Sequence, residues 1–392
     1  MRPSLRIAGV SSGTSDAWEI YFRASERIAA GAPVAMLTIG DHDWPTEAPI
    51  LDAMDASARA GQTGYAHMSG IPPLRAAIAE QMTAQTGIST TPEQIQVTPG
   101  GQGALYAAFM ACIDPGDRAL IIAPYYATYP DTVRAASGVL SVLDTRSEDG
   151  FQPQRAALEA ACAGCRAILV NSPHNPTGAV YSEATLAAIA EIAVAQDLWV
   201  ISDEVYATQV YAGAHRSLRA LPGMAERTLV VNSLSKSHVM TGFRIGWLAG
   251  PPEIMRYVAD LGMATTYGVP GFIQEAALFA LRDGAAIGAR THAVYARRRA
   301  LALDILGGAN GLRMLPPQGA MYVFLDIRAT GLSGKAFANR LLDEEEIAVM
   351  PGESFGDAAA GHVRVALTLE DARLEDALRR LAGFAARHAR EG

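Results

Sequence analysis

The chain of 392 residues is poor in cysteine, with only Cys112, Cys162 and Cys165. So few cysteines exclude a disulfide framework, and a chain of this length buries enough surface to fold without one. The Cys-Ala-Gly-Cys segment at residues 162–165 could be a redox pair or half of a zinc site, but no second such pair accompanies it. We therefore expect reduced cysteines that serve packing.

Long apolar runs and dense blocks of positive charge are also missing. No apolar run reaches the roughly 18 residues of a membrane span, and the amino-terminal segment lacks the apolar core of a signal peptide. The net charge is −8, and no cluster of lysine and arginine is present to bind nucleic acid or anionic lipid. These absences lead us to expect a cytoplasmic protein that acts on small molecules.

Short apolar runs do alternate with helical stretches through the middle of the chain. They lie at residues 119–123, 139–143, 167–170, 199–201 and 229–231. Runs that are apolar on both faces and separated by helices indicate a parallel sheet covered on both sides.

The carboxyl-terminal part has a different character, with strands expected at residues 320–326 and 362–367. We therefore predict an α/β protein with two domains. Residues 49–284 form a large three-layer domain with a mostly parallel sheet. Residues 285–392 form a smaller α+β domain, which residues 1–48 join, so that the small domain is built from both chain ends.

A helix near residues 285–306 is expected to bridge the two parts. It carries three consecutive arginines, Arg297, Arg298 and Arg299. A run of charge on a long helix is most simply a solvated face, so we expect all three side chains to be exposed.

One lysine stands in an unusual setting. Residues 229–250 read LVVNSLSKSHVMTGFRIGWLAG, which places Lys236 among hydroxyl groups between two apolar runs. A free lysine amine has a pKa of about 10.4 and is a poor nucleophile at neutral pH unless it is desolvated or held as an imine. Schiff-base chemistry is one use that explains this setting.

Other polar residues follow the expected strands closely. Ligands of parallel sheets bind beyond the carboxyl ends of the strands. The glycine turn at residues 100–103 can offer backbone N–H groups to an anion such as phosphate, although a tight turn needed for packing explains it equally well. The residues that this rule brings to one site are Gly100, Tyr126, Asn175, Asp203, Tyr206 and Lys236.

Pyridoxal 5'-phosphate needs partners of these kinds: an amine for its aldehyde, a carboxylate for its ring nitrogen, donors for its phenolic oxygen and a cradle for its phosphate. Seven motifs follow one another over almost the whole chain: GYAHMSGIPPLR, VTPGGQGAL, APYYATYP, NSPHNPTG, SDEVY, SLSKSHVMTGFRIGW and HVRVAL. In these motifs and their order the chain resembles the fold-type I, class I/II aminotransferases, the aspartate aminotransferase superfamily. The resemblance implies a homodimer with shared active sites that exchanges the amino group between an L-amino acid and a 2-oxo acid.

The resemblance also implies roles for single residues. Lys236 forms the internal aldimine and moves the proton between substrate Cα and cofactor C4′, and Asp203 pairs with the pyridine nitrogen. The expected contacts to the ring and its phenolic oxygen are Tyr126, Asn175 and Tyr206. The expected contacts to the phosphate are the backbone amides of Gly101 and Gln102, the side chains of Ser233 and Arg244, and Tyr65 from the second subunit. The expected contacts to the substrate carboxylate are Arg364, Gly40 and Asn175.

Two details depart from the family's commonest pattern. A Gly-Asp-His-Asp-Trp segment at residues 40–44 replaces a Gly-Glu-Pro-Asp-Phe-like turn, and its acidic and imidazole side chains could be a metal fragment. We favour a turn and expect no metal. His174 gives Pro-His-Asn-Pro-Thr-Gly, a form also seen in glutamine-, methionine- or aromatic-type transaminases and in carbon–sulfur β-lyases. These departures leave the substrate open and keep a pyridoxal phosphate-dependent β-lyase as an alternative.

Overall fold

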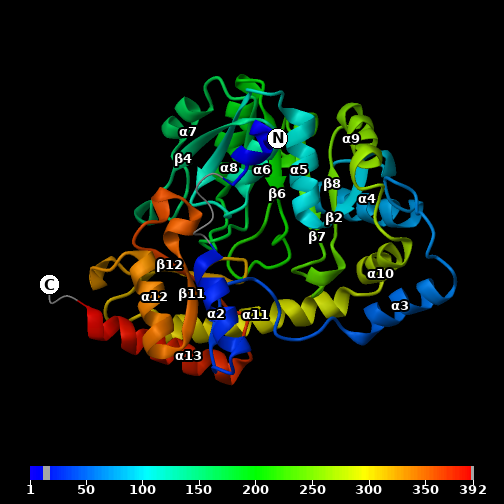
Figure 1. Ribbon diagram of the computed structural model, residues 1–392. Coiled ribbons are helices and arrows are strands. Elements are labelled where there is room, and N and C mark those ends of the chain that lie inside the picture. The colour runs from blue at the N-terminus through cyan, green and yellow to red at the C-terminus, as the bar shows by residue number, and fades with distance from the viewer. Residues whose placement is uncertain (12–17, 390–392) are drawn as a thin grey trace.

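The computed structural model describes residues 1–11 and 18–389, arranged around two sheets (Figure 1). The strands of the large sheet are β2 (Ile95–Pro99), β3 (Arg118–Ala123), β4 (Val139–Asp144), β5 (Ala167–Asn171), β6 (Trp199–Asp203), β7 (Thr228–Ser233) and β8 (Ile245–Ala249). Their spatial order is β2-β8-β7-β6-β5-β3-β4. All neighbouring pairs from β7 to β4 are parallel, and β8 runs antiparallel to both of its neighbours. The register aligns the polar ends of β5 and β6, since Asn171 pairs with Asp203, and Asp203 pairs with Val231 two residues before the end of β7.

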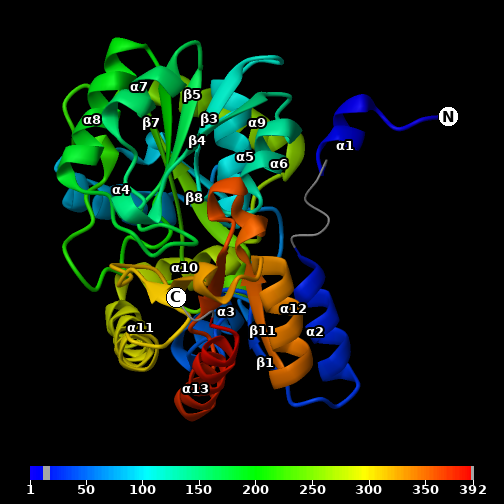
Figure 2. The ribbon, with the colours of Figure 1, turned by 90° about the vertical axis from the view of Figure 1, so that its left-hand side faces the viewer.

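Helices cover both faces of the large sheet (Figure 2). One face carries α5 (Gly100–Cys112), α6 (Tyr129–Ala135) and α9 (Pro252–Thr265). The other carries α3 (Ala48–Arg59), α4 (Pro72–Thr86), α7 (Arg155–Cys162), α8 (Glu183–Ala195) and α10 (Gly271–Arg282). Successive strand residues point to opposite faces, so Ile121 packs into the first core and Leu120 into the second. The predicted three-layer α/β fold is confirmed.

A smaller sheet lies below the large one in Figure 1. Its strands are β1 (Ala35–Leu37), β9 (Arg313–Met314), β10 (Tyr322–Asp326), β11 (Ile347–Pro351) and β12 (His362–Ala366). They lie in the order β1-β11-β12-β10-β9, and the amino-terminal strand β1 pairs in parallel with β11. The sheet packs with α2 (Glu19–Ala29), α12 (Gly334–Glu345) and α13 (Asp371–His388). Both chain ends thus contribute here, while the boundaries at residues 48 and 284 stay a prediction.

The long helix α11 (Ala285–Leu306) has the bounds expected from the sequence and passes beneath the large domain (Figure 1). The expectation of a solvated arginine face is wrong for Arg298, whose side chain is only 4% exposed. It pairs with Asp43 at 2.7 Å and with Asp371 at 2.9 Å. Arg297 is exposed as expected. Arg298 therefore joins the amino-terminal segment, α11 and α13 through buried charge.

The three cysteines, Cys112, Cys162 and Cys165, are free thiols. Cys112 and Cys162 are buried in the helix–sheet cores. Burial raises the pKa of the Cys162 thiol to about 12, which disfavours its reactive thiolate form. Among the described residues, no helix combines the length and apolar character needed to cross a membrane.

Candidate active site

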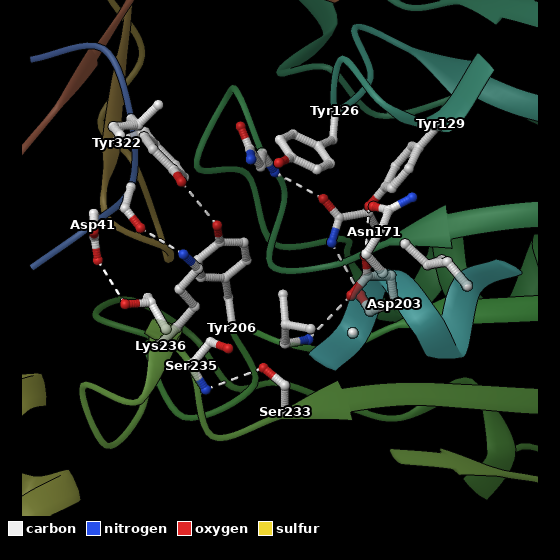
Figure 3. A pocket seen from close by; sticks show the side chains of 18 of the residues that line it. Asp41, Tyr126, Tyr129, Asn171, Asp203, Tyr206, Ser233, Ser235, Lys236 and Tyr322 are labelled. Carbon is white, nitrogen blue, oxygen red and sulfur yellow. Dashed lines mark hydrogen bonds between the residues drawn. The ribbon is translucent and has the colours of Figure 1, made fainter. Parts of the chain in front are cut away.

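A cavity of about 260 Å³ opens beyond the carboxyl ends of the parallel strands. The small sheet supplies its other wall, through β10 and β12. Its polar and charged lining comes from both sheets and from the connecting loops (Figure 3). The lining residues used below are Trp18, Ile39, Gly40, Asp41, Gly101, Gln102, Tyr126, Tyr129, Asn171, Asn175, Asp203, Tyr206, Ser233, Ser235, Lys236, Thr241, Arg244, Tyr322 and Arg364.

Lys236 reaches across this cavity from the loop after β7 (Figure 3). Its Nζ donates a hydrogen bond to the carbonyl oxygen of Gly40, which belongs to the amino-terminal segment. Gln209 Nε2 donates to the Lys236 carbonyl at 2.8 Å, and the Ser235 amide donates to Ser233 Oγ at 3.1 Å. The backbone on both sides of the lysine is therefore held, while the amine itself faces the cavity.

Asp203 ends β6 and is 4% exposed. The Tyr129 hydroxyl donates to its Oδ2 at 2.7 Å, and the Val205 amide donates to its Oδ1 at 3.3 Å. Burial raises the pKa of the Asp203 carboxyl to about 6, although these two hydrogen bonds act to lower the pKa. No cation pairs with it among the described residues, so the site is suited to a positively charged group from outside the chain.

The amino-terminal end of α5 offers unused hydrogen-bond donors. Its N-cap is Pro99, and no side chain caps the helix, which leaves the first backbone N–H groups without a side-chain partner. Arg244 approaches this end so closely that a Cβ on Gly100 would meet Arg244 Nη2 at 2.6 Å. Gly100 also has φ +74°, a conformation that favours glycine. Helix end, arginine and Ser233 together can hold an anion.

Arg364 is a second cationic site, at 2% exposed. Its guanidinium lies 4.4 Å from the ring centroid of Tyr322 and 4.7 Å from that of Phe355. Nη1 donates to Asn175 Oδ1 at 2.8 Å and Nη2 donates to the Thr38 carbonyl, while Nε has no partner in the described part of the chain. A buried guanidinium without a carboxylate partner is costly unless an anion completes it.

Phenol and amide groups line the space between these charges. The hydroxyls of Tyr206 and Tyr322 are 2.9 Å apart. The backbone N–H of Asn175 donates to Asn171 Oδ1 at 2.9 Å. Because Asn175 Oδ1 accepts from Arg364, its side-chain amino group is left to donate to a ligand. Tyr126 stands edge-on to Tyr129, with ring centroids 5.6 Å apart.

These features fit the pyridoxal phosphate that the sequence led us to expect. The lysine amine suits its aldehyde, and the uncapped helix end beside Arg244 suits its phosphate. Asp203, which lacks a cationic partner, suits its protonated ring nitrogen. The fit is chemical: the amine, the carboxylate and the anion-binding groups of the site each have a counterpart in this one molecule.

The predicted site residues other than Gly100 and Tyr65 line the cavity of their own chain. Tyr65 is 88% exposed, and its ring packs edge-on against Tyr267 with centroids 4.9 Å apart. This position does not test the expectation that Tyr65 serves a second subunit.

The two unusual sequence features have structural partners. His174 is buried outside the cavity, with Nδ1 at 2.7 Å from the Thr177 hydroxyl. Asp41 and His42 lie in a segment without regular structure, which bends at Asp43 and Trp44. No group of three or more metal-binding side chains occurs in residues 1–11 and 18–389.

Several lining residues were missed in the sequence. Tyr129 belongs to a tyrosine-rich motif and Asn171 opens the Asn-Ser-Pro motif, so both lay within reach of the strand-end rule. Trp18 and Tyr322 carry no local signal, because one precedes a helix and the other sits in an apolar strand. Only the packing of the small sheet on the large one brings them to the cavity.

Comparisons with known proteins agree with this site. Residues 34–381 match the family model described as aminotransferase class I and II. The arginine–pyruvate transaminase AruH of Pseudomonas aeruginosa is 43% identical over 97% of this chain and 96% of that protein. The aspartate/prephenate aminotransferase of Thermus thermophilus is 38% identical over 97% of this chain and 96% of that protein.

Solved structures lead to the same group. A single mutant of Thermus thermophilus aspartate aminotransferase superposes with a TM-score of 0.92 at 36% identity, covering 98% of this chain and 100% of the other. The relatives named here are aminotransferases, so the comparisons do not favour the β-lyase alternative.

Proposed function

The chain belongs to the aminotransferase class I and II family, and from this premise we propose how its own residues carry out transamination between an L-amino acid and a 2-oxo acid. When bound, pyridoxal phosphate supplies an aldehyde that takes up the amino group and a ring that spreads negative charge from the substrate Cα. The observation that carries the proposal is the presence of Lys236 and the buried, cation-free Asp203 in one cavity.

Lys236 would hold the cofactor through its aldehyde, and its amine would take up and return the proton at the substrate Cα. The chain contains only one other lysine, Lys335, which pairs with Glu19 at the surface of the small domain. Hydrogen bonds hold the backbone around Lys236, and this supports the role. An amine that acts on two atoms in turn needs a fixed backbone and a side chain that can move between them.

Asp203 holds the pyridine nitrogen in its protonated form. An ionised carboxylate next to the nitrogen raises the pKa of that nitrogen, and burial strengthens the interaction. Tyr129 and the Val205 amide hold the carboxylate in position. Tyr206 and Asn175 would donate hydrogen bonds to the phenolic oxygen, and Tyr126 would contact the ring.

The phosphate is held by the α5 end and its neighbours. Backbone amides of Gly101 and Gln102, the Ser233 hydroxyl and the Arg244 guanidinium supply the donors. Hydrogen bonds to a charged group contribute about 1.5–3 kcal/mol each. Several together retain the cofactor while the amine of Lys236 is free for proton transfer.

Arg364 binds the substrate α-carboxylate, with Gly40 and Asn175 beside it. The stacked guanidinium cannot rotate freely between the rings of Tyr322 and Phe355, which orients its donors toward one face. The substrate carboxylate neutralises the buried charge of Arg364. The hydrogen bond from Arg364 to Asn175 then links substrate binding to the residue that donates to the phenolic oxygen.

We further infer a homodimer in which Tyr65 reaches the phosphate of the second subunit, and a cytoplasmic location. The exposed ring of Tyr65 supports the first inference. Three free cysteines support the second, because reduced thiols are usual in the cytosol.

A half-reaction screen tests the proposal. The enzyme loaded with pyridoxal phosphate is mixed with single L-amino acids, and the absorbance of the cofactor is followed without any 2-oxo acid. Conversion to the pyridoxamine form, reversed by a 2-oxo acid, is expected. Release of pyruvate and a thiol from cystathionine without an acceptor, with no such conversion, would instead identify the β-lyase.

A further inference from the structure

The cavity contains five charged side chains, and four of them have assigned partners under the proposed function. Lys236 serves the aldehyde, Arg244 the phosphate, Arg364 the α-carboxylate and Asp203 the ring nitrogen. The fifth, Asp41, has no assigned partner. Among the described lining residues, no cation remains to pair with an acidic substrate side chain.

Asp41 lines the same cavity as Lys236. It directly follows Gly40, whose carbonyl accepts the hydrogen bond from Lys236 Nζ. In Figure 3 a dashed line marks the hydrogen bond that the Asp41 carboxylate accepts from the Thr241 hydroxyl, and both residues line the cavity together with Lys236. A substrate held at Lys236 and Arg364 therefore brings its side chain within the same lined space as Asp41.

One oxygen of this carboxylate is occupied and the other is open. The Thr241 hydroxyl donates to Asp41 Oδ1 at 2.7 Å, and the His42 amide donates to the same atom at 3.1 Å. In the described part of the chain, Oδ2 has no hydrogen-bond or ion-pair partner. Asp41 is exposed and its carboxylate is oriented by neutral donors, so Oδ2 stays open to solvent or to a ligand.

The segment that carries Asp41 is anchored on its far side. His42 Nε2 lies 3.2 Å from the Ser235 carbonyl, and His42 Nδ1 lies 2.8 Å from the Tyr295 hydroxyl. Asp43 pairs with the buried Arg298 at 2.7 Å. These contacts tie the segment to the lysine loop and to α11, so Asp41 is a fixed feature of the cavity rather than part of a free loop.

We propose that Asp41 receives the cationic side chain of a basic L-amino acid, with L-arginine as its best representative. A guanidinium can bond to a carboxylate with two parallel N–H donors, and Oδ2 offers the open acceptor. Trp18 and Ile39, which line the same cavity, provide apolar surface for the methylene stem. The inference rests on the proposed function, since it needs Arg364 to bind the α-carboxylate.

The test compares L-arginine with L-citrulline, which has nearly the same shape but no charge on its side chain. We expect the enzyme to prefer arginine, and Asp41→Asn to lower the arginine-to-citrulline ratio of kcat/KM by about ten- to hundredfold, the value of one hydrogen bond to a charged group. Asp41→Glu keeps the charge and should retain a preference for arginine. Asp260→Asn, which removes an exposed carboxylate on α9, is the matched control and should leave the ratio unchanged.

The ratio within each variant is its own control for folding. An Asp41→Asn ratio equal to that of the unaltered enzyme, or a faster half-reaction with L-aspartate than with L-arginine, would overturn the assignment of Asp41 while leaving transamination intact. An enzyme that reacts with no amino acid at all would instead remove the proposed function, and this inference with it.

Discussion

Asp203 is a buried carboxyl with a raised pKa, and under the proposed function it pairs with the ring nitrogen of the cofactor. Its pKa is raised from 3.8 to about 6 by burial, so the stability it contributes as a neutral acid is present below about pH 4 and lost as the pH rises through 6. At neutral pH the ionised form destabilises the cofactor-free protein by an amount on the order of 3 kcal/mol.

We therefore predict that Asp203→Asn stabilises the cofactor-free protein above about pH 6, and that the gain shrinks toward zero near pH 4. Loading with pyridoxal phosphate should reverse the order, because only the aspartate pairs with the ring nitrogen, and the half-reaction should be lost. Denaturant unfolding of both forms at several pH values measures the difference. Asp144→Asn, at an exposed position, is the control, and a difference that does not vary with pH would contradict the account.

The same scale shows what the sequence could and could not reveal about the site. Asp203 lies at the carboxyl end of a strand, and Lys236 and Asn175 lie in the loops just beyond two others, so the strand-end rule placed them together without any structure. Arg364 alone looks like an ordinary strand residue, and only the family motif suggested its role. Its burial depends on the rings of Tyr322 and Phe355, which belong to separate elements.

At the scale of the element, the amino-terminal end of α5 is the part of the fold best suited to bind an anion. The helix begins after a proline that cannot cap it, at a glycine that leaves room for Arg244. Both choices cost intrinsic helix stability, and both favour an anion at the helix end.

Arg244→Gln should therefore weaken binding of pyridoxal phosphate by about ten- to hundredfold and barely change binding of pyridoxal, which lacks the phosphate. Fluorescence titration of the cofactor-free protein with both compounds measures this ratio. Arg256→Gln, on the exposed side of α9, should change neither affinity. Equal weakening of both compounds by Arg244→Gln would show that the arginine acts on the fold and not on the phosphate.

Helices and strands were predicted well where local pattern decides them. The bounds of α11 and the Ser182 cap of α8 follow from periodicity and capping chemistry, and Ser182 Oγ indeed accepts from the Thr185 amide at 3.1 Å. The burial of Arg298 could not be predicted in this way. Its partner Asp43 is 255 residues away in the chain, and an arginine run carries no sign of which member finds such a partner.

At the scale of the molecule, the cavity exists because two sheets meet. The large sheet supplies Lys236 and Asp203, and the small sheet supplies Tyr322 and Arg364. A change in the angle between the sheets would therefore separate the cofactor groups from the substrate carboxylate site. Under the proposed dimer, the exposed Tyr65 of a second copy completes the phosphate site.

Hybrid dimers test this sharing. We expect the chain to sediment as a dimer and Tyr65→Phe to weaken pyridoxal phosphate binding by about tenfold. In a hybrid of one Lys236→Ala protomer and one Tyr65→Phe protomer, the site that keeps Lys236 should bind with the affinity of the unaltered enzyme, since its Tyr65 comes from the other protomer. Weak binding at that site would mean that Tyr65 acts within its own chain, and a monomer would exclude sharing.

The central claim is that Lys236 carries the cofactor, and the chain allows a direct test because it has only two lysines. The loaded enzyme is reduced with borohydride, which fixes the cofactor to its lysine, and the labelled peptide is identified by mass spectrometry. We predict a label on Lys236 alone. The label should be retained in Lys335→Arg, and Lys236→Ala should lose both the label and transamination. A label on Lys335, or full activity in Lys236→Ala, would contradict the account.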